Sequence, residues 1–397
     1  MIANRRPRTS GRGPSAGLPG CVDGAAAAAV GVHADAVERL TRRMGLPGSS
    51  SPAADPPPHP APIGGRRAPD PRALIFDAMG ELRPEYDAAL IREMLASGMD
   101  AITVTLCDPK PVGAEGLELA VDGLLIYDRF IASHPDLLLK ATSVADLRRA
   151  RESGRMAVFY LYQNSDQFGA DLDRVEMFYR LGLRSCQITY NERNRAGVGC
   201  RAEGDNGGLT DFGRALVERM NGVGMLVDLS HANMPTMADT IAHSAAPVII
   251  SHTGCDAVHS HVRNTTDANL RATAEKGGVV GICQLRPFLT EKKKDNLHAF
   301  FDHVDHAVNV CGVEHVAIGS DRDHRVIVMT PEYEAELRRE EGSQVVASEL
   351  PYFIDELNGP RRMEVVWDGL VGRGYAQADV ERIMGGNLLR IYRDVIG

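Results

Sequence analysis

The fold is decided by residues 225–252, which read MLVDLSHANMPTMADTIAHSAAPVIISH. Two short apolar runs, 225–231 and 246–252, each end in the pair Ser-His, and the residues between them have the spacing of an amphipathic helix. A strand, a helix and a second strand in this order form a parallel βαβ unit. Since the carboxyl ends of parallel strands meet on one edge of a sheet, we expect His231 and His252 to lie close together.

The same alternation continues outward from this unit in both directions. Further strands are predicted at 73–79, 101–107, 156–163, 184–190, 279–285 and 315–321, and further helices at 84–98, 143–154, 171–182, 209–224, 266–278 and 297–312. Eight strands separated by helices favour a parallel α/β fold closed into a (β/α)8 TIM barrel. A doubly wound open sheet is the alternative, and it is disfavoured because no Gly-rich dinucleotide or phosphate-binding motif follows any strand. The final segment, 376–396, predicts one or two helices packed on the outside.

Residues 1–72 differ in composition from the rest of the chain. They are rich in Arg, Gly, Pro, Ala and Ser, which predicts a low-complexity, disordered N-terminal extension in which 25–44 could form a short helix. Residues 73–397 would then form the barrel. An export signal is disfavoured because the apolar run near the N-terminus is short and Ala-rich. Seven scattered cysteines without a CxxC pair indicate reduced thiols and a cytoplasmic location.

Charge and hydropathy exclude two classes of partner. A formal net charge of −9 argues against a nucleic-acid partner, because phosphate binding needs a basic surface. No apolar run approaches the roughly 20 residues that span a bilayer, so no membrane partner is expected. With 44% hydrophobic and 24% charged residues, the composition is ordinary for a soluble globular enzyme.

Several predicted strands end in residues that are capable of chemistry. Active sites of parallel barrels lie at the carboxyl ends of the strands, so one rim is expected to carry Asp77, Glu81, Gln163, Tyr190, His231, His252 and Asp321. The repeated Ser-His pair, together with Gly319-Ser320-Asp321, favours a functional site over isolated capping histidines, and imidazole is a preferred zinc ligand. By contrast, His298, His303 and His306 share one helical face and are predicted to be solvated or packing residues.

Four segments, 208–254, 262–282, 315–323 and 374–392, resemble the membrane (renal-type) dipeptidase family, peptidase family M19. The resemblance covers residues 73–397 and rests on the series SH, SH, RN and GSD. It implies a (β/α)8 barrel of the metallo-dependent hydrolase type, usually a homodimer, with two zinc ions. In that family the zinc ions assist water in attacking the amide of small dipeptides.

Four residues of this chain match family positions with a known role. The resemblance implies that His231 and His252 bind the second metal, and that Asp321 handles the proton of the attacking water. It also implies that Arg263, in Val262-Arg263-Asn264, holds the terminal carboxylate of the substrate. A guanidinium suits this task because it can bind a carboxylate through two hydrogen bonds.

Four other family positions carry different residues in this chain. Met79 and Glu81 stand where the family has the His and Asp that bind the first metal, and Gln163 replaces the bridging glutamate. Tyr190 replaces the histidine that supports the tetrahedral intermediate, and it retains a hydroxyl donor for that role. A thioether is a poor zinc ligand, and a neutral amide does not offset the repulsion between two zinc ions. We therefore expect one zinc ion rather than two.

Three interpretations remain open at the level of sequence. In the first, His231 and His252, with Gln163, Glu81 or water, hold one zinc and Asp321 acts as the base. In the second, the barrel binds a small ligand without turnover. In the third, Glu81, Tyr190 and Asp321 perform acid–base chemistry without a metal. The charged segment 324–362 is an insertion that could form a lid, a subunit contact or simply a solvated surface.

Overall fold

The computed structural model describes residues 73–341 and 345–397, and the predicted N-terminal extension lies outside them. Within these residues, eight parallel strands follow one another around a barrel in the order β1-β2-β4-β5-β6-β7-β8-β9. Their bounds are β1 Ile75–Asp77, β2 Met99–Thr105, β4 Met156–Tyr162, β5 Leu183–Gln187, β6 Leu226–Asp228, β7 Ile249–Thr253, β8 Val279–Ile282 and β9 Val316–Ile318. The amide of Ala78 donates to the carbonyl of Ile318 at 2.9 Å, which joins the first strand to the last. The predicted (β/α)8 barrel is therefore confirmed.

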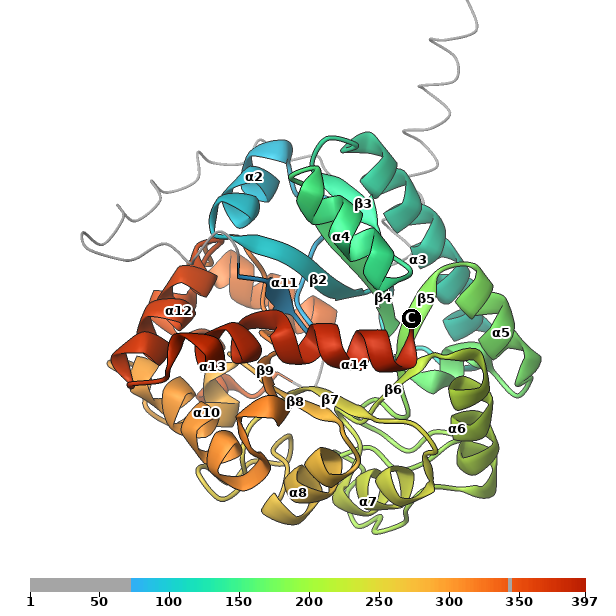
Figure 1. Cartoon of the computed structure of the whole chain (residues 1–397). Coiled ribbons are helices and arrows are strands. Elements are labelled where there is room, and N and C mark those ends of the chain that lie inside the picture. The colour runs from blue at the N-terminus through green and yellow to red at the C-terminus, as the bar shows by residue number, and fades with distance from the viewer. Residues whose placement is uncertain (1–72, 342–344) are drawn as a thin grey trace, which may run out of the picture. The chain divides into compact units, whose positions relative to one another are not determined.

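Helices surround the barrel as the alternation predicts (Figure 1). They are α2 Ala88–Ala96, α3 Gly113–Ser133, α4 Val144–Glu152, α5 Asp173–Arg180, α6 Asp211–Val223, α7 Met234–His243, α8 Asp267–Glu275, α9 Arg286–Leu289 and α10 Leu297–Cys311. Side chains of Asp87, Ser143, Thr210 and Asn233 accept a backbone N–H at the start of α2, α4, α6 and α7, which is why these helices begin where they do. The sequence pattern did not predict α3 or the short strand β3 (Leu138–Lys140), which pairs with β4 outside the barrel order.

The C-terminal helices close one end of the barrel. After α13 (Gln377–Glu381), helix α14 (Asn387–Val395) crosses the amino-terminal ends of the strands (Figure 1). The ring of Tyr392 packs between those of Phe76 and Phe159, with centroids 4.9 and 4.8 Å away, and its hydroxyl lies 2.5 Å from Thr103 Oγ1. The segment for which the sequence predicts one or two helices thus contains α13 and α14, and α14 covers an end of the barrel. Since α14 covers the amino-terminal ends, the carboxyl ends of the strands form the other rim of the barrel.

The insertion is fastened to that rim by two buried arginines. It contains α11 (Pro331–Glu341) and leads into α12 (Arg362–Gly372). Arg286 donates to the carbonyls of Pro351 and Thr290, each at 2.8 Å, and to that of Glu349. Arg362 donates to the carbonyls of Gly359, Arg322 and Asp323. Because every nitrogen of both guanidinium groups has a partner, these buried charges hold the insertion against the barrel.

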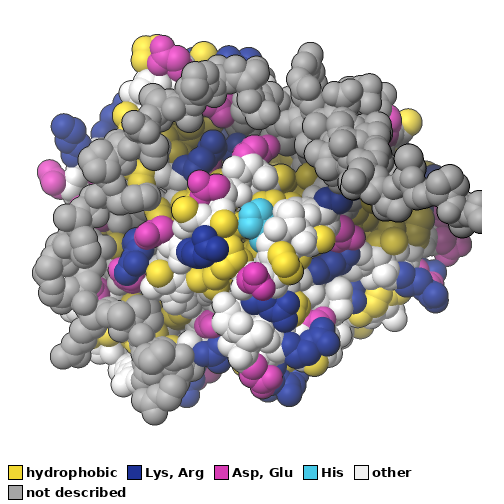
Figure 2. All heavy atoms as spheres, turned by 90° about the horizontal axis from the view of Figure 1, so that it is seen from above, with side chains coloured by type: hydrophobic (Ala, Val, Ile, Leu, Met, Phe, Trp, Pro, Cys, Tyr) yellow, Lys and Arg dark blue, Asp and Glu magenta, His cyan; other side chains and the backbone are white. Residues whose placement is uncertain are grey.

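The surface carries no concentration of one charge on the face seen in Figure 2, where cationic and anionic side chains are intermixed. Within the described residues, no helix combines the length and apolar character that a membrane span requires.

His303 is buried, accepting the amide of Cys255 at 2.8 Å, while its other ring nitrogen lies 3.1 Å from the carbonyl of Leu289. His303 is therefore a packing residue, which is one of the two roles that the sequence predicts for it.

Candidate functional site

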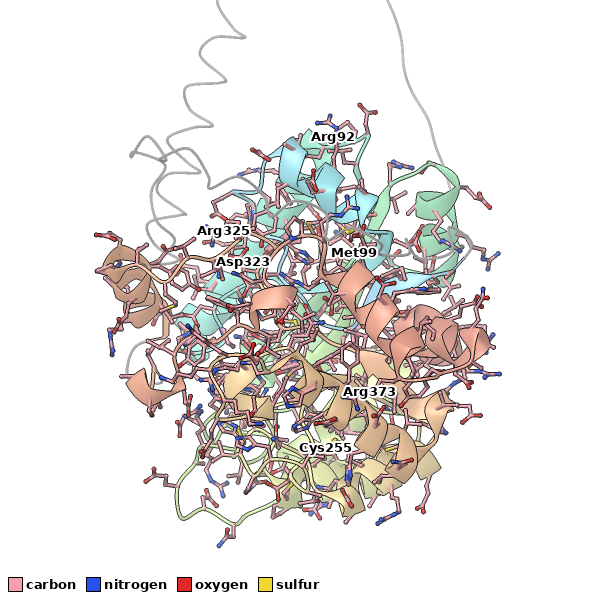
Figure 3. The ribbon with its side chains drawn as sticks, turned by 90° about the vertical axis from the view of Figure 1, so that its left-hand side faces the viewer. Arg92, Met99, Cys255, Asp323, Arg325 and Arg373 are labelled. Atoms are coloured by element: carbon pink, nitrogen blue, oxygen red, sulfur yellow. The ribbon has the colours of Figure 1, made fainter. Side chains whose placement is uncertain are left out.

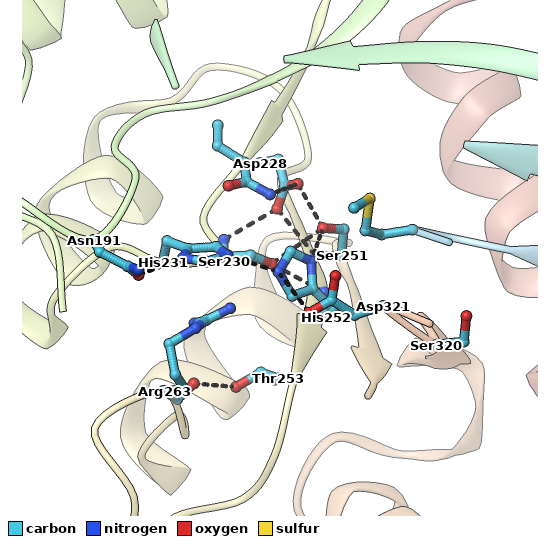
Figure 4. A network of polar contacts seen from close by, with 12 residues as sticks. Asn191, Asp228, Ser230, His231, Ser251, His252, Thr253, Arg263, Ser320 and Asp321 are labelled. Carbon is cyan, nitrogen blue, oxygen red and sulfur yellow. Dashed lines mark hydrogen bonds and ion pairs between the residues drawn. The ribbon is translucent and has the colours of Figure 1, made fainter. Parts of the chain in front are cut away.

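Two histidines meet at the carboxyl ends of β6 and β7. The Nε2 atoms of His231 and His252 lie 3.0 Å apart, and an oxygen of Asp321, which follows β9, lies 3.9 Å from Nε2 of His252 (Figure 4). His231 and Asp321 have φ values of 69° and 52°, a region that residues other than glycine seldom adopt. Backbone strain of this kind is concentrated at functional sites. The structure therefore brings together three of the residues that the sequence selects.

Asp228, at the end of β6, organises the backbone beneath the histidines. Its carboxylate accepts the amides of Ser230 and Ser251 at 3.0 Å each, the hydroxyl of Ser251 at 2.6 Å and the side-chain amide of Gln187 at 3.1 Å. The hydroxyl oxygen of Ser230 accepts the amide of His252 at 2.9 Å. Four hydrogen bonds to one carboxylate fix the ends of β6 and β7 relative to each other.

The same network sets the tautomer of both rings. Ser251 gives its hydroxyl proton to Asp228, so it must accept from Nδ1 of His252, which lies 2.9 Å away. Nδ1 of His231 lies 2.6 Å from the amide oxygen of Asn191 and also carries a proton. Each Nε2 atom then turns a lone pair toward the other. Two lone pairs at this distance repel, so the pair is suited to bind one metal ion between them.

Burial keeps both imidazoles neutral. Desolvation, reinforced by the positive charge of Arg263, lowers the pKa of His231 well below its usual range and that of His252 to about 3. Neutral imidazole is the form that binds metals. Burial raises the pKa of the Asp321 carboxyl, while the charges of Arg263 and Arg322 act in the opposite direction. A carboxyl with a raised pKa is a better proton acceptor than an ordinary aspartate.

Arg263 presents a donor that nothing in the described protein uses. The residue is 5% exposed, and its guanidinium points toward the histidine pair (Figure 4). Its Nη2 atom is buried and has no hydrogen-bond partner among the described residues. Leaving a buried charged donor unpaired is costly, so the position calls for an anionic group of a ligand.

The β1 end of the rim lies beside Asp321, since the carbonyl of Met79 accepts the amide of Asp321 at 2.8 Å. Met79 is buried, and the carboxylate of Glu81 lies 2.5 Å from the guanidinium of Arg83. Gln163 is buried after β4 and forms no hydrogen bond with either histidine. Tyr190 does reach the site, since its ring stacks on that of His231 with centroids 4.3 Å apart.

These positions bear on the zinc ions that the family resemblance implies. Within residues 73–341 and 345–397, no group of three or more His, Cys, Asp or Glu side chains is arranged to hold a metal ion. The two lone pairs of His231 and His252, with Asp321 nearby, nevertheless fit one ion whose coordination is completed by water or ligand. Met79 and the Arg83-paired Glu81 do not fit a second.

Sequence reasoning missed Asp228, Asn191 and Gln187. Asp228 stands inside an apolar strand, three residues before His231, and a charged residue that is fully buried in a strand needs a polar partner. That signal could have identified it. The partnership of Asn191 with His231 depends on loop conformation, which no spacing in the sequence reveals.

The chain is similar to known proteins along most of the barrel. Residues 82–332 match the model of a family described as membrane dipeptidase (peptidase family M19). Dipeptidase verJ of Clonostachys rogersoniana is 30% identical over 282 residues, which are 71% of this chain and 66% of that protein. Dipeptidase tcpJ of Claviceps purpurea is 29% identical over 68% of this chain and 58% of its own length. The chain therefore spans about three fifths to two thirds of these two fungal relatives.

Solved structures share the barrel. An amidohydrolase from Pseudomonas aeruginosa matches with a TM-score of 0.73 and 26% identity, covering 82% of this chain and 98% of that one. A metallopeptidase from Rhodobacter sphaeroides, solved with a phosphinate mimic of the dipeptide L-Ala-D-Ala, matches with a TM-score of 0.67 and 18% identity. That match covers 81% of this chain and 99% of the other. At that identity the second likeness shows the fold alone.

Proposed function

This chain belongs to the membrane dipeptidase family, peptidase family M19, and on that premise we propose that it hydrolyses a dipeptide or small amide with a free carboxylate, using one zinc ion rather than two. The observation that carries the proposal is the unpaired, buried Nη2 atom of Arg263 beside the pair of neutral histidines. A buried guanidinium selects a carboxylate, and the histidine pair lies beside the place where the neighbouring amide would sit.

Each residue of the site has a distinct task in this proposal. Arg263 binds the carboxylate and so positions the amide. The Nε2 atoms of His231 and His252 would hold the zinc ion, which would lower the pKa of a bound water molecule and polarise the amide carbonyl. Asp321 takes the proton of the attacking water and returns it to the leaving amine, a task that its raised pKa favours. Tyr190 offers its hydroxyl to the developing oxyanion.

The comparisons support a dipeptide as the substrate class. The relatives from Clonostachys rogersoniana and Claviceps purpurea are named dipeptidases. The substrate of this chain is inferred from those proteins and from Arg263. The homodimer and the cytoplasmic location that we expect from the sequence remain predictions.

One observation favours a second candidate, a homologue that binds a small ligand without turnover or uses metal-free acid–base chemistry. A separation of 3.0 Å between the two Nε2 atoms is also a hydrogen-bond distance, so one neutral ring with its proton moved to Nε2 could donate to the other and hold the pair without a metal. The pairing of Glu81 with Arg83 leaves the rim with few anionic ligands for a dication. Tyr190 and Asp321 would then be the residues left for proton transfer.

Metal content separates the two candidates. We would measure zinc by elemental analysis after purification without added metal, and again after dialysis against zinc, in the wild-type chain and in the double variant H231A/H252A. The variant H306A is the matched control, since His306 pairs with Asp267 on the outside of the barrel. We expect about one zinc per chain, lost in the double variant and kept in H306A, with hydrolysis of simple dipeptides following the metal. No zinc after dialysis would reject the one-zinc hydrolase.

A further inference from the structure

A second buried arginine, Arg322, resembles Arg263 in having a guanidinium nitrogen without a hydrogen-bond partner among the described residues. Arg322 is 5% exposed, and its Nη2 atom is buried without a hydrogen-bond partner among the described residues. The structural arginines Arg286 and Arg362 differ, because each of their guanidinium nitrogens donates to a neighbouring oxygen. One nitrogen of each rim arginine therefore lacks the kind of partner that every guanidinium nitrogen of Arg286 and Arg362 has.

Arg322 lies between the catalytic rim and the insertion. It follows Asp321, and its carbonyl accepts the amide of Glu81 at 3.2 Å, which fixes its backbone. Its guanidinium carbon lies 5.9 Å from the ring centroid of Phe353, a residue of the insertion. Arg322 and Arg263 both act electrostatically on the carboxyl of Asp321, and the charges of both lower its pKa.

The neighbouring carboxylates of Asp323 and Glu81 already have other partners. Asp323 lies beside Arg325 (Figure 3) and accepts from it at 2.9 Å, and it also accepts the hydroxyl of Tyr86 at 2.5 Å. Glu81 pairs with Arg83. Two buried donor nitrogens, Nη2 of Arg263 and Nη2 of Arg322, have no hydrogen-bond partner among the described residues. A ligand with two acidic groups would satisfy both.

We propose that Arg322 recognises a second acidic group of the substrate, so that the preferred substrates are dipeptides or small amides with a carboxylate in addition to the one that Arg263 binds. This inference rests on the proposed function and deepens it. The second carboxylate would lie beneath the insertion, on the side of Phe353, while the first lies beside the histidines. Arg322 thus determines substrate specificity, whereas the histidines and Asp321 carry out the hydrolysis.

Matched substrates test the proposal directly. We would compare Gly-Glu with Gly-Gln and Glu-Gly with Gln-Gly, because each pair differs only in one charge, using wild type, R322M and R322K. The control R338M removes an exposed arginine of the same insertion, which pairs with Glu334. In wild type we expect kcat/KM for one acidic member to exceed that of its amide roughly ten- to a hundredfold. R322M should abolish this preference through KM, R322K should keep part of it, and R338M should keep all of it.

Binding measurements distinguish failure of this inference from failure of the proposed function. If wild type hydrolyses the acidic and amide members equally well, the role of Arg322 is overturned while the dipeptidase activity stands. If no dipeptide is hydrolysed, calorimetric titration with glutarate, butyrate and inorganic phosphate tests whether the chain binds a second acidic group. Tighter binding of glutarate than butyrate, weakened in R322M but not in R338M, supports the second acidic position without the activity. Preference for phosphate, or equal binding of glutarate by R322M, overturns it. Melting temperatures establish that each variant is folded.

Discussion

The two halves of the barrel rim are built differently, although the same alternation of strands and helices produces both. At the ends of β6 and β7, Asp228 binds the backbone and hydroxyl groups around His252 and so orients its ring. At the ends of β1 and β4 stand Met79 and Gln163, neither of which bonds to the histidines. The carboxylate of Asp228 therefore acts on an imidazole, whereas the matching carboxylate of β1, Asp77, binds Ser320, so the two halves differ in the groups that are oriented.

The largest effect is expected from removing the carboxylate anchor of the histidine half. R263M should lower kcat/KM for a dipeptide on the order of 10²- to 10³-fold, because the substrate carboxylate would be buried against an apolar side chain. R263K keeps the positive charge but cannot bind a carboxylate through two parallel hydrogen bonds, so its kcat/KM should fall less than that of R263M. Steady-state kinetics with a dipeptide and with its C-terminal amide provide the test. An equal loss for the amide would show that Arg263 does not bind a carboxylate.

The next effect concerns the carboxylate that organises the histidines. In D228N an amide group replaces one carboxylate oxygen, so the Ser251 hydroxyl can turn its proton toward Nδ1 of His252. The ring would then carry its proton on Nε2, and the lone pair needed for zinc would be lost. We expect zinc affinity and kcat/KM to fall roughly 10- to 100-fold, as for other residues that orient a metal ligand.

Asp77 gives this prediction its control, because it occupies the corresponding strand end on the other half of the rim. Its carboxylate accepts the amide of Ser320 at 2.8 Å and the Ser320 hydroxyl, but it touches neither histidine. D77N should therefore change zinc affinity far less than D228N. Equal losses in the two variants would mean that the halves of the rim do not differ in function.

The sequence predicted the fold well, because strand–helix alternation is a local pattern that depends on hydrophobic spacing. All eight barrel strands were predicted, whereas the short β3 lacks a long apolar run and was missed. The meeting of His231 and His252 followed from parallel strand geometry. The pairing of Glu81 with Arg83 could not be predicted, because it depends on the side-chain conformations of both residues, which the sequence does not give. Likewise, only packing reveals that the donor of Arg322 is unpaired.

Restoring ligands to the β1–β4 half would sharpen the comparison. In M79H/Q163E an imidazole and a carboxylate return to the positions where related dipeptidases are expected to bind the first metal and bridge the pair. We expect zinc content to rise from about one to about two ions per chain, because the added carboxylate offsets the repulsion between two dications. Elemental analysis measures this, and M79L/Q163N is the matched control. A content that stays at one would show that the pairing of Glu81 with Arg83 keeps this half closed.

The smallest effect concerns pH and again contrasts the halves. Burial raises the pKa of Asp77 to about 6, against hydrogen bonds from Ser320 and the charge of Arg362, which lower it. Between the ordinary aspartate pKa and 6 the folded chain binds more protons than the unfolded chain. Asp77 therefore favours folding below this window, and its contribution is lost as the pH rises through 6.

The variant D77N, which cannot ionise, should remove this loss. Its amide can still accept the backbone N–H of Ser320 and can donate to the Ser320 hydroxyl oxygen, so the fold should persist. Urea unfolding at several pH values from 4 to 7 measures the slope of the unfolding free energy, which should be more positive in D77N than in wild type. Identical slopes would mean that Asp77 ionises normally in the fold. In that case the β1 side of the rim would carry a full negative charge, and the contrast with the histidine half would be one of geometry rather than of charge.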